Sequence, residues 1–206
     1  WLVDQNSKMI VVACNTASSL ALDYIKSKFD LPIIGVIEPG IHSAISITKN
    51  KRVGILGTNA TIKSDAYGDG LRAANDQISV VSQACPLFVP LAEEGWVSGD
   101  VPTAIATTYL EPIKRSNVDT LILGCTHYPL LKSILRQILG SDVSLVDSGE
   151  ATAAAVNSVL SENNIVSNEN TGEIHCYVTD SRDSFEALAG RFVHSNISEI
   201  THVDIS

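Results

Sequence analysis

Short aliphatic and β-branched runs alternate with longer segments of helical periodicity along most of this 206-residue chain. The runs of strand length lie at residues 9–13, 32–37, 52–56, 78–82, 120–123 and 143–146. Strands this apolar, separated by helices, are typical of parallel sheets that are covered by helices on both faces. The alternation therefore predicts an α/β fold with mainly parallel sheets, in which ligands bind beyond the carboxyl ends of the strands.

The periodic segments between these runs define the expected helices. They lie at residues 17–28, 39–48, 61–75, 101–115 and 129–139. The last part of the chain continues with further expected elements of both kinds. They are a helix at 150–160, a polar loop at 161–171, a strand at 174–178, a helix at 182–193 and a short strand at 200–204.

Composition restricts the partners and the compartment. The chain has 14 Lys and Arg against 23 Asp and Glu, for a formal net charge of −9, and it has no basic stripe. Such a chain has no field that attracts nucleic acid or an anionic membrane, and no apolar run approaches the roughly 20 residues that span a bilayer. The cysteines lack zinc or disulfide-scaffold spacing. We therefore expect a soluble cytoplasmic protein with free thiols and with neither nucleic acid nor membrane as a partner.

One sequence pattern occurs twice. An apolar strand, a small residue, a cysteine and two polar residues end in Cys14-Asn15-Thr16 and again in Cys125-Thr126-His127. Each copy is followed by an expected helix and by a strand that ends in an acid and a glycine, at residues 38–40 and 147–149. The repetition indicates either a duplicated α/β half or the ordinary likeness of one βα unit to another.

A cysteine between a parallel strand and a helix lies where α/β proteins build their sites. The helix N-terminus favours a thiolate over a thiol, and nearby hydroxyl and amide groups can bind a carboxylate. Either cysteine alone could instead be a small buried apolar residue. Two thiols on opposite sides of one carbon suit stereochemical inversion, in which one removes a proton and the other delivers one. A redox disulfide is the alternative for such a pair.

The segments around the two cysteines, Val11-Val-Ala-Cys-Asn-Thr-Ala-Ser18 and Leu121-Ile-Leu-Gly-Cys-Thr-His-Tyr-Pro129, resemble the two signature turns of bacterial glutamate racemases. The resemblance continues in order at residues 34–40, 54–61, 83–95 and 145–149. It implies two pseudo-symmetric α/β lobes with an active-site cleft between them. The first lobe would comprise residues 1–35 plus 149–206, and the second residues 36–148.

The resemblance also implies a function. Members of this family interconvert L-glutamate and D-glutamate without a cofactor or a metal, supply D-glutamate for peptidoglycan, and are often homodimers. In this chain Cys14 would act on D-glutamate and Cys125 on L-glutamate, each reprotonating the product of the other. Glu93 and His127 would assist the second thiol. The implied substrate contacts are Asn15, Thr16, Thr58, Thr61, Thr126 and His127.

Several of these residues have a plainer interpretation. Thr58 and Thr61 precede an expected helix, so they could be ordinary helix caps. His127 could be a hydrogen-bonded wall residue, and Glu93 could belong to an exposed pair of glutamates. Cys85 precedes Pro86 in an apolar segment and is expected to be buried in the core. Cys176 is expected to be structural, because no second cysteine or histidine lies at zinc-finger spacing from it and His175.

The family pattern breaks at the start of the chain. The Asp-Ser-Gly-x-Gly-Gly loop and the Pro-Tyr-Gly loop of the family do not occur before Cys14, and the chain begins with Trp1. We therefore expect a fragment that by itself is inactive or poorly folded in its first half. Three other functions stay open: racemisation of aspartate or another acidic amino acid, a non-catalytic binding protein on the same fold, and a thiol-redox protein.

Overall fold

The computed structural model describes residues 1–167, 172–192 and 197–205. The chain forms two compact units, Lys8–Asn164, and Trp1–Ser7 together with Ile165–Ser206. Every strand pair within the described ranges is parallel, which confirms the predicted α/β fold with mainly parallel sheets. The division into lobes at residues 35/36 and 148/149 stays a prediction.

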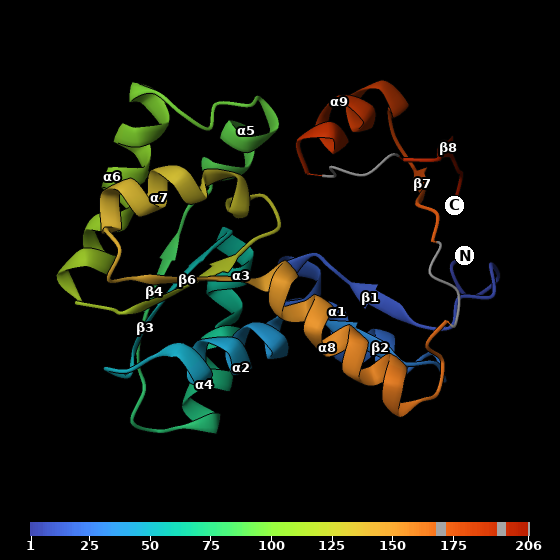
Figure 1. Ribbon diagram of the computed structural model, residues 1–206, viewed down its shortest axis with the longest axis horizontal. Coiled ribbons are helices and arrows are strands. Elements are labelled where there is room, and N and C mark those ends of the chain that lie inside the picture. Colours follow the sequence, from blue (N-terminus) through green and yellow to red (C-terminus); the bar gives the residue numbers. More distant parts are fainter. Residues whose placement is uncertain (168–171, 193–196, 206) are drawn as a thin grey trace. The chain divides into compact units, whose positions relative to one another are not determined.

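A four-stranded parallel sheet with the order β4-β3-β5-β6 forms the centre of the larger unit (Figure 1). Its strands are β3 (Arg52–Gly57), β4 (Ser79–Ala84), β5 (Thr120–Gly124) and β6 (Ser144–Asp147). A second parallel pair consists of β1 (Ile10–Val12) and β2 (Ile33–Gly35). Each strand falls on or beside a predicted apolar run. The central strands β3 and β5 are buried along almost their whole length, as expected for strands that are covered on both sheet faces.

Helices follow the strands of this unit in chain order. They are α1 (Asn15–Lys26), α2 (Ile37–Ile47), α3 (Asn59–Ser64), α4 (Ala66–Ala74), α5 (Phe88–Glu93), α6 (Asp100–Arg115), α7 (Lys132–Leu139) and α8 (Ser148–Glu162). Residues Tyr128–Leu131 form the short 3₁₀ helix η1 before α7. The predictions for α1, α2, α6 and α8 are confirmed to within a few residues at each end.

Two predictions about helices are wrong, and one helix was missed. The single helix expected at 61–75 is two helices, α3 and α4, because Asp65 between them has a left-handed backbone with φ of 51°. The helix expected at 129–139 begins as the tighter turn η1, so α7 starts only at Lys132. The short helix α5 was not predicted, since six residues carry too little periodicity to be recognised.

Side chains from alternate positions of β3 and β5 enter different cores. Leu56, Leu121 and Leu123 pack with Phe88 and residues of α6 and α7, whereas Val53, Ile55 and Ile122 pack with residues of α2 and α4. Figure 1 shows α6 and α7 on one side of the sheet and α2 and α4 on the other. Because successive side chains of a strand point to opposite faces, the same two strands contribute to both cores.

The carboxylate of Asp119, directly before β5, connects the sheet to the C-terminal end of α2. Asp119 accepts hydrogen bonds from Thr48 Oγ1 and from the backbone N–H groups of Lys49 and Asn50, each at 2.7 Å, and from Thr120 Oγ1 at 3.0 Å. Burial acts to raise the pKa of Asp119, but these bonds outweigh it and hold the pKa below the ordinary 3.8.

Replacing this carboxylate should change both stability and its pH dependence. The folded pKa lies below the unfolded one, so the stabilisation is present above about pH 4 and is lost as the pH falls through the folded pKa. Asp119→Asn should lower the free energy of unfolding by about 1 kcal/mol at pH 7 and flatten its decline between about pH 5 and 2.5. Urea unfolding at several pH values measures both effects. Exposed Asp23→Asn is the control, and an acid decline as steep as that of the wild type would contradict the prediction.

The smaller unit contains β7 (His175–Val178), α9 (Arg182–Phe192) and β8 (Glu199–His202). Here the ring of Trp1 lies 4.7 Å from that of Tyr177, centroid to centroid. Both strands and the helix were predicted, although residue 193 of the expected helix and residues 168–171 of the expected loop lie outside the described residues. None of the helices described is both long and apolar enough to cross a bilayer.

Candidate active site

Cys14 lies in the short link between β1 and α1. It is exposed and occupies the N-cap position of α1, and its carbonyl accepts the first helical hydrogen bond from the N–H of Ser18 at 2.8 Å. The hydroxyl of Ser18 donates back to the carbonyl of Val12 at 2.7 Å, which fixes the turn at the end of the strand. The predicted position of Cys14, between a strand end and the positive end of a helix, is confirmed.

Cys125 directly follows β5 and is buried, with 6% of its surface exposed. The turn of η1 comes next, so the α-helix N-terminus that the sequence predicted here is absent. Burial raises the pKa of the Cys125 thiol, and negative charge on Cys14 raises it further. The backbone N–H of His127 and the hydroxyl of Thr126 act in the opposite direction but do not outweigh burial. The expectation of a favoured thiolate is therefore wrong for Cys125.

The two thiols have different surroundings. Negative charge on Cys14 acts to raise the pKa of Cys125, so ionisation of one thiol disfavours ionisation of the other. One thiol is exposed at a helix N-terminus and the other is buried. The surroundings therefore disfavour a charge on Cys125.

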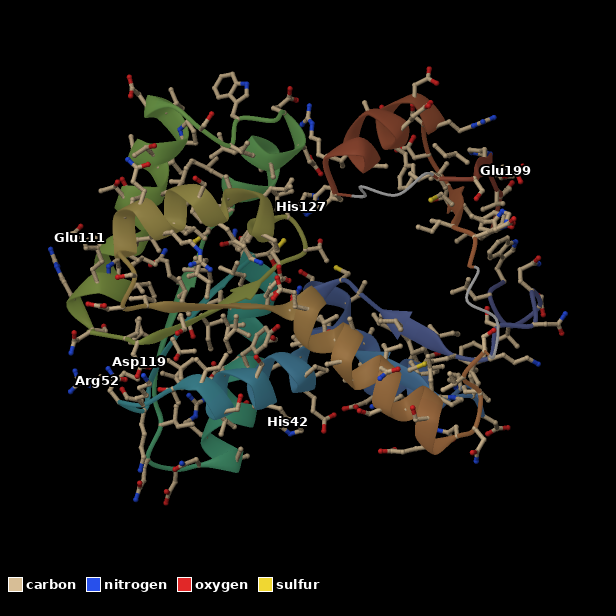
Figure 2. The ribbon with its side chains drawn as sticks, in the orientation of Figure 1. His42, Arg52, Glu111, Asp119, His127 and Glu199 are labelled. Atoms are coloured by element: carbon tan, nitrogen blue, oxygen red, sulfur yellow. The ribbon has the colours of Figure 1, made fainter. Side chains whose placement is uncertain are left out.

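Cys125 is the first member of a chain of three side chains, with His127, which is labelled in Figure 2, in the middle. Sγ of Cys125 lies 3.8 Å from Nδ1 of His127, and Nε2 of His127 lies 3.4 Å from Oε1 of Glu93. Thr126 Oγ1 also contacts His127 Nδ1, at 3.3 Å. Glu93 lies at the end of α5 and has half of its side chain exposed. It precedes Cys125 by 32 residues in the sequence, so only the fold brings it to this turn. The predicted grouping of Glu93, His127 and Cys125 is present in the structure.

Three threonine hydroxyls form a triangle at the start of α1 and α3. Thr16 Oγ1 lies 2.9 Å from Thr58 Oγ1 and 3.1 Å from Thr61 Oγ1, and the last two hydroxyls are 3.1 Å apart. Thr58 also caps α3, because its Oγ1 accepts from the N–H of Thr61 at 3.2 Å. The capping interpretation of Thr58 is thus confirmed, and it coexists with a cluster of hydroxyls that the sequence alone could not bring together.

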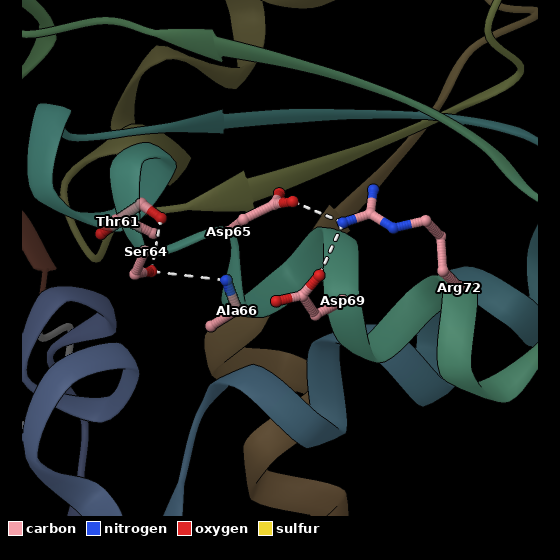
Figure 3. Close-up of polar contacts among 6 residues, drawn as sticks. All are labelled: Thr61, Ser64, Asp65, Ala66, Asp69 and Arg72. Atoms are coloured by element: carbon pink, nitrogen blue, oxygen red, sulfur yellow. Dashed lines mark hydrogen bonds and ion pairs between the residues drawn. The ribbon is translucent and has the colours of Figure 1, made fainter.

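The junction between α3 and α4 holds this cluster in place (Figure 3). Ser64 Oγ donates to the carbonyl of Thr61 at 2.8 Å and accepts from the N–H of Ala66 at 3.4 Å. Arg72 pairs with Asp65 and, at 2.8 Å, with Asp69. These contacts stabilise the left-handed backbone of Asp65, where α3 ends and α4 begins.

Asn15, next to Cys14, is 2% exposed and belongs to a buried polar chain. Its Oδ1 accepts from the hydroxyl of Tyr67 at 2.6 Å, and its Nδ2 donates to Oγ of Ser148 at 3.4 Å. Burial, followed by the charge of Cys125, raises the pKa of Tyr67 far above 10, so its hydroxyl remains a donor. Sequence reasoning missed Tyr67, because in its helix it is indistinguishable from an ordinary core aromatic residue.

A pocket of about 390 Å³ opens beside both cysteine turns. Ala13 and Thr126, the neighbours of the two cysteines, lie in its wall together with Ser148 at the start of α8. Most of the remaining wall is aliphatic. The polar residues of this wall are Thr126, Asp147, Ser148 and Thr152, and the threonine cluster is not part of it.

All four cysteines of the chain are free thiols. Cys85 is fully buried, as predicted, and burial raises its pKa. Cys176 is half-buried in β7. Among the residues that the structure describes, no group of three or more His, Cys, Asp or Glu side chains could hold a metal ion.

Comparison with known proteins agrees with this geometry. The model of the Asp/Glu/Hydantoin racemase family matches residues 2–156. The glutamate racemase of Geobacter metallireducens is 42% identical over 206 residues, which cover all of this chain and 76% of that protein. The crystal structure of glutamate racemase isoform RacE1 from Bacillus anthracis has a TM-score of 0.94 at 35% identity, covering 99% of this chain and 76% of that chain.

A second solved structure matches almost as closely. Glutamate racemase from Francisella tularensis in complex with D-glutamate has a TM-score of 0.91 at 35% identity, covering 98% of this chain and 76% of that chain. Sequence and structure thus agree along almost the entire chain. This chain belongs to the Asp/Glu/Hydantoin racemase family, in the group of the glutamate racemases.

Proposed function

We propose that this protein interconverts L-glutamate and D-glutamate by proton transfer between two thiols, without a cofactor, and so supplies D-glutamate for peptidoglycan. The observation that carries the proposal is the presence of a thiol directly after each of two parallel strands, Cys14 exposed at the N-terminus of α1 and Cys125 buried beside His127. Members of the racemase family use this inversion chemistry, and a non-catalytic binding protein has no need of both thiols.

The two directions of the reaction mirror each other. With D-glutamate, the Cys14 thiolate removes the proton from Cα, and the electron pair of the broken bond stays on Cα and its carboxylate. The Cys125 thiol then gives its proton to the opposite face, which forms L-glutamate and leaves Cys14 protonated and Cys125 ionised. L-glutamate is converted by the same steps in reverse.

The surroundings of the two thiols support these roles. Burial, together with a charge on Cys14, raises the pKa of Cys125, so Cys125 keeps a proton to donate while Cys14 is ionised. In the other direction Cys125 must lose its proton. His127 Nδ1 can accept it through the 3.8 Å contact if the imidazole holds its proton on Nε2, facing Glu93. We therefore assign Glu93 and His127 to assist the second thiol.

Substrate binding is assigned to the groups around the two turns. The hydroxyls of Thr16, Thr58 and Thr61 and the free N–H groups of α1 suit a carboxylate, since a helix N-terminus attracts anions. Thr126 and His127 lie on the side of the second thiol, and Asn15 lies beside the first. Oriented donors of this kind stabilise the charge that develops on the substrate when Cα loses its proton.

The compartment and the assembly state are part of the same proposal. A reaction that needs both thiols reduced fits the cytoplasm, where cysteines are kept reduced. A homodimer stays a prediction.

The proposal is tested by proton NMR in D2O with each glutamate enantiomer, using the protein in its natural full length. Both enantiomers should lose their α-proton signal, and the product enantiomer should carry one deuteron at Cα. D- and L-aspartate serve as the comparison substrates, for which slower exchange is expected. A folded protein that exchanges aspartate but not glutamate would move the assignment to the other acidic amino acid, and exchange of neither would contradict racemisation.

A further inference from the structure

We infer that Tyr67 is a positioning residue for both thiols: its hydroxyl orients Asn15 beside Cys14, and its ring supports the turn that carries Cys125. The inference rests on the proposed racemase function. It concerns a residue in α4, outside both cysteine turns and the threonine cluster.

The hydroxyl of Tyr67 begins a chain of hydrogen bonds that crosses the site. It donates to Asn15 Oδ1 at 2.6 Å, Asn15 Nδ2 donates to Ser148 Oγ at 3.4 Å, and Ser148 Oγ donates to the carbonyl of Leu123 at 3.4 Å. The chain thereby connects α4, α1, α8 and β5. Tyr67 and Asn15 are each 2% exposed, so water cannot replace either partner at low cost.

This chain determines which edge of the Asn15 amide faces the site. A tyrosine hydroxyl that donates must face the carbonyl edge of the amide, and the amino edge is then directed toward Ser148. The amino group has two hydrogens and the bond to Ser148 uses one, so the other remains for an acceptor such as a substrate carboxylate. Without the hydroxyl of Tyr67, the amide can rotate and exchange its two edges.

The ring of Tyr67 fills the space between two backbone segments. A Cβ atom added at Gly40 would lie 3.1 Å from Tyr67 Cε1 and 3.2 Å from its hydroxyl oxygen, and one at Gly124 would lie 3.2 Å from Cε2. Gly124 is the last residue of β5 and directly precedes Cys125. One side chain therefore packs against the backbone of the second thiol turn while its hydroxyl holds the first.

Tyr67→Phe tests the hydroxyl, because the ring and its packing remain. We expect kcat/KM for glutamate to fall about tenfold or more, since small misplacements of catalytic groups have large effects on rate. The fall must be equal in both directions, because enantiomers have equal free energy. Tyr109→Phe is the matched control: this half-buried tyrosine of α6 lies outside both cysteine turns, loses the bond that its hydroxyl accepts from the N–H of Leu87 at 3.4 Å, and should keep kcat/KM within about threefold.

A double-mutant cycle with Asn15→Ala separates positioning from a general structural effect. If Tyr67 acts through Asn15, adding Tyr67→Phe to Asn15→Ala should lower kcat/KM by less than about twofold further. Fully additive losses, or no loss in Tyr67→Phe, would overturn the inference. A wild-type protein that fails to racemise glutamate would instead overturn the proposed function, so the two failures are distinguishable.

Gly40→Ala gives a second test that removes no polar group. Its new methyl group would lie 3.1 Å from Tyr67 Cε1 and 3.2 Å from the hydroxyl oxygen, so the tyrosine must shift by a few tenths of an ångström while Asn15 stays intact. We expect a fall in kcat/KM of about threefold in the wild-type background and almost none in the Tyr67→Phe background. An equal fall in both backgrounds would contradict an effect through the hydroxyl. Circular dichroism and thermal unfolding of each variant identify any loss of folding.

Discussion

Cys14→Ser and Cys125→Ser should each lower the rate of glutamate racemisation by about a thousandfold or more. A serine hydroxyl has nearly the size of the thiol, but it is far too weak an acid to be ionised beside Cα at neutral pH. Either substitution therefore leaves one face of Cα without an acid–base group. Racemisation assays with D-glutamate and with L-glutamate measure the loss, and Cys176→Ser, in β7, should stay within about twofold of the wild type.

The two variants should also differ from each other in D2O. Any residual exchange in Cys14→Ser should occur with L-glutamate and without inversion, because Cys125 can still remove and return a proton on its own face. Cys125→Ser should show the opposite preference. Racemisation that survives either substitution at more than about a tenth of the wild-type rate would rule out the two-thiol mechanism.

Gly124→Ala should destabilise the protein by about 3 kcal/mol and lower its Tm by about 6–12 °C. The new Cβ would lie 2.6 Å from the carbonyl oxygen of Leu56 on the neighbouring strand β3, a distance that real Cβ atoms do not tolerate. A backbone carbonyl within a sheet cannot rotate away, so β5 must shift against β3. Cys125 follows directly and moves with it, so racemisation should fall together with stability.

Thermal unfolding monitored by circular dichroism measures this change. Gly190→Ala in α9 is the matched control, because a Cβ there meets nothing within 4 Å and alanine favours the helix. The control should leave Tm unchanged or raise it. A Gly124→Ala protein with the Tm of the wild type would show that β5 can accommodate a side chain at this position.

Much of the fold could be read from the chain because the signals are local. The two central strands, β3 and β5, coincide with apolar runs because nearly all of their residues are buried. The position of Cys14 at the end of β1 and the cap at Thr58 also follow from neighbouring residues. The helix break at Asp65 was missed because a left-handed aspartate is stabilised by Arg72, which lies seven residues further on.

The sequence by itself determined the α/β class, the two cysteine turns and the family, because these depend on residues that are neighbours in the chain. Only the tertiary structure decided which groups meet. Glu93 reaches His127 from α5, Thr16 meets Thr58 and Thr61 from another helix, and Tyr67 connects the two turns. The tertiary structure also raises the pKa of Cys125, because burial outweighs the local hydrogen bonds of its thiol. Burial depends on packing between distant segments, which the local sequence does not show.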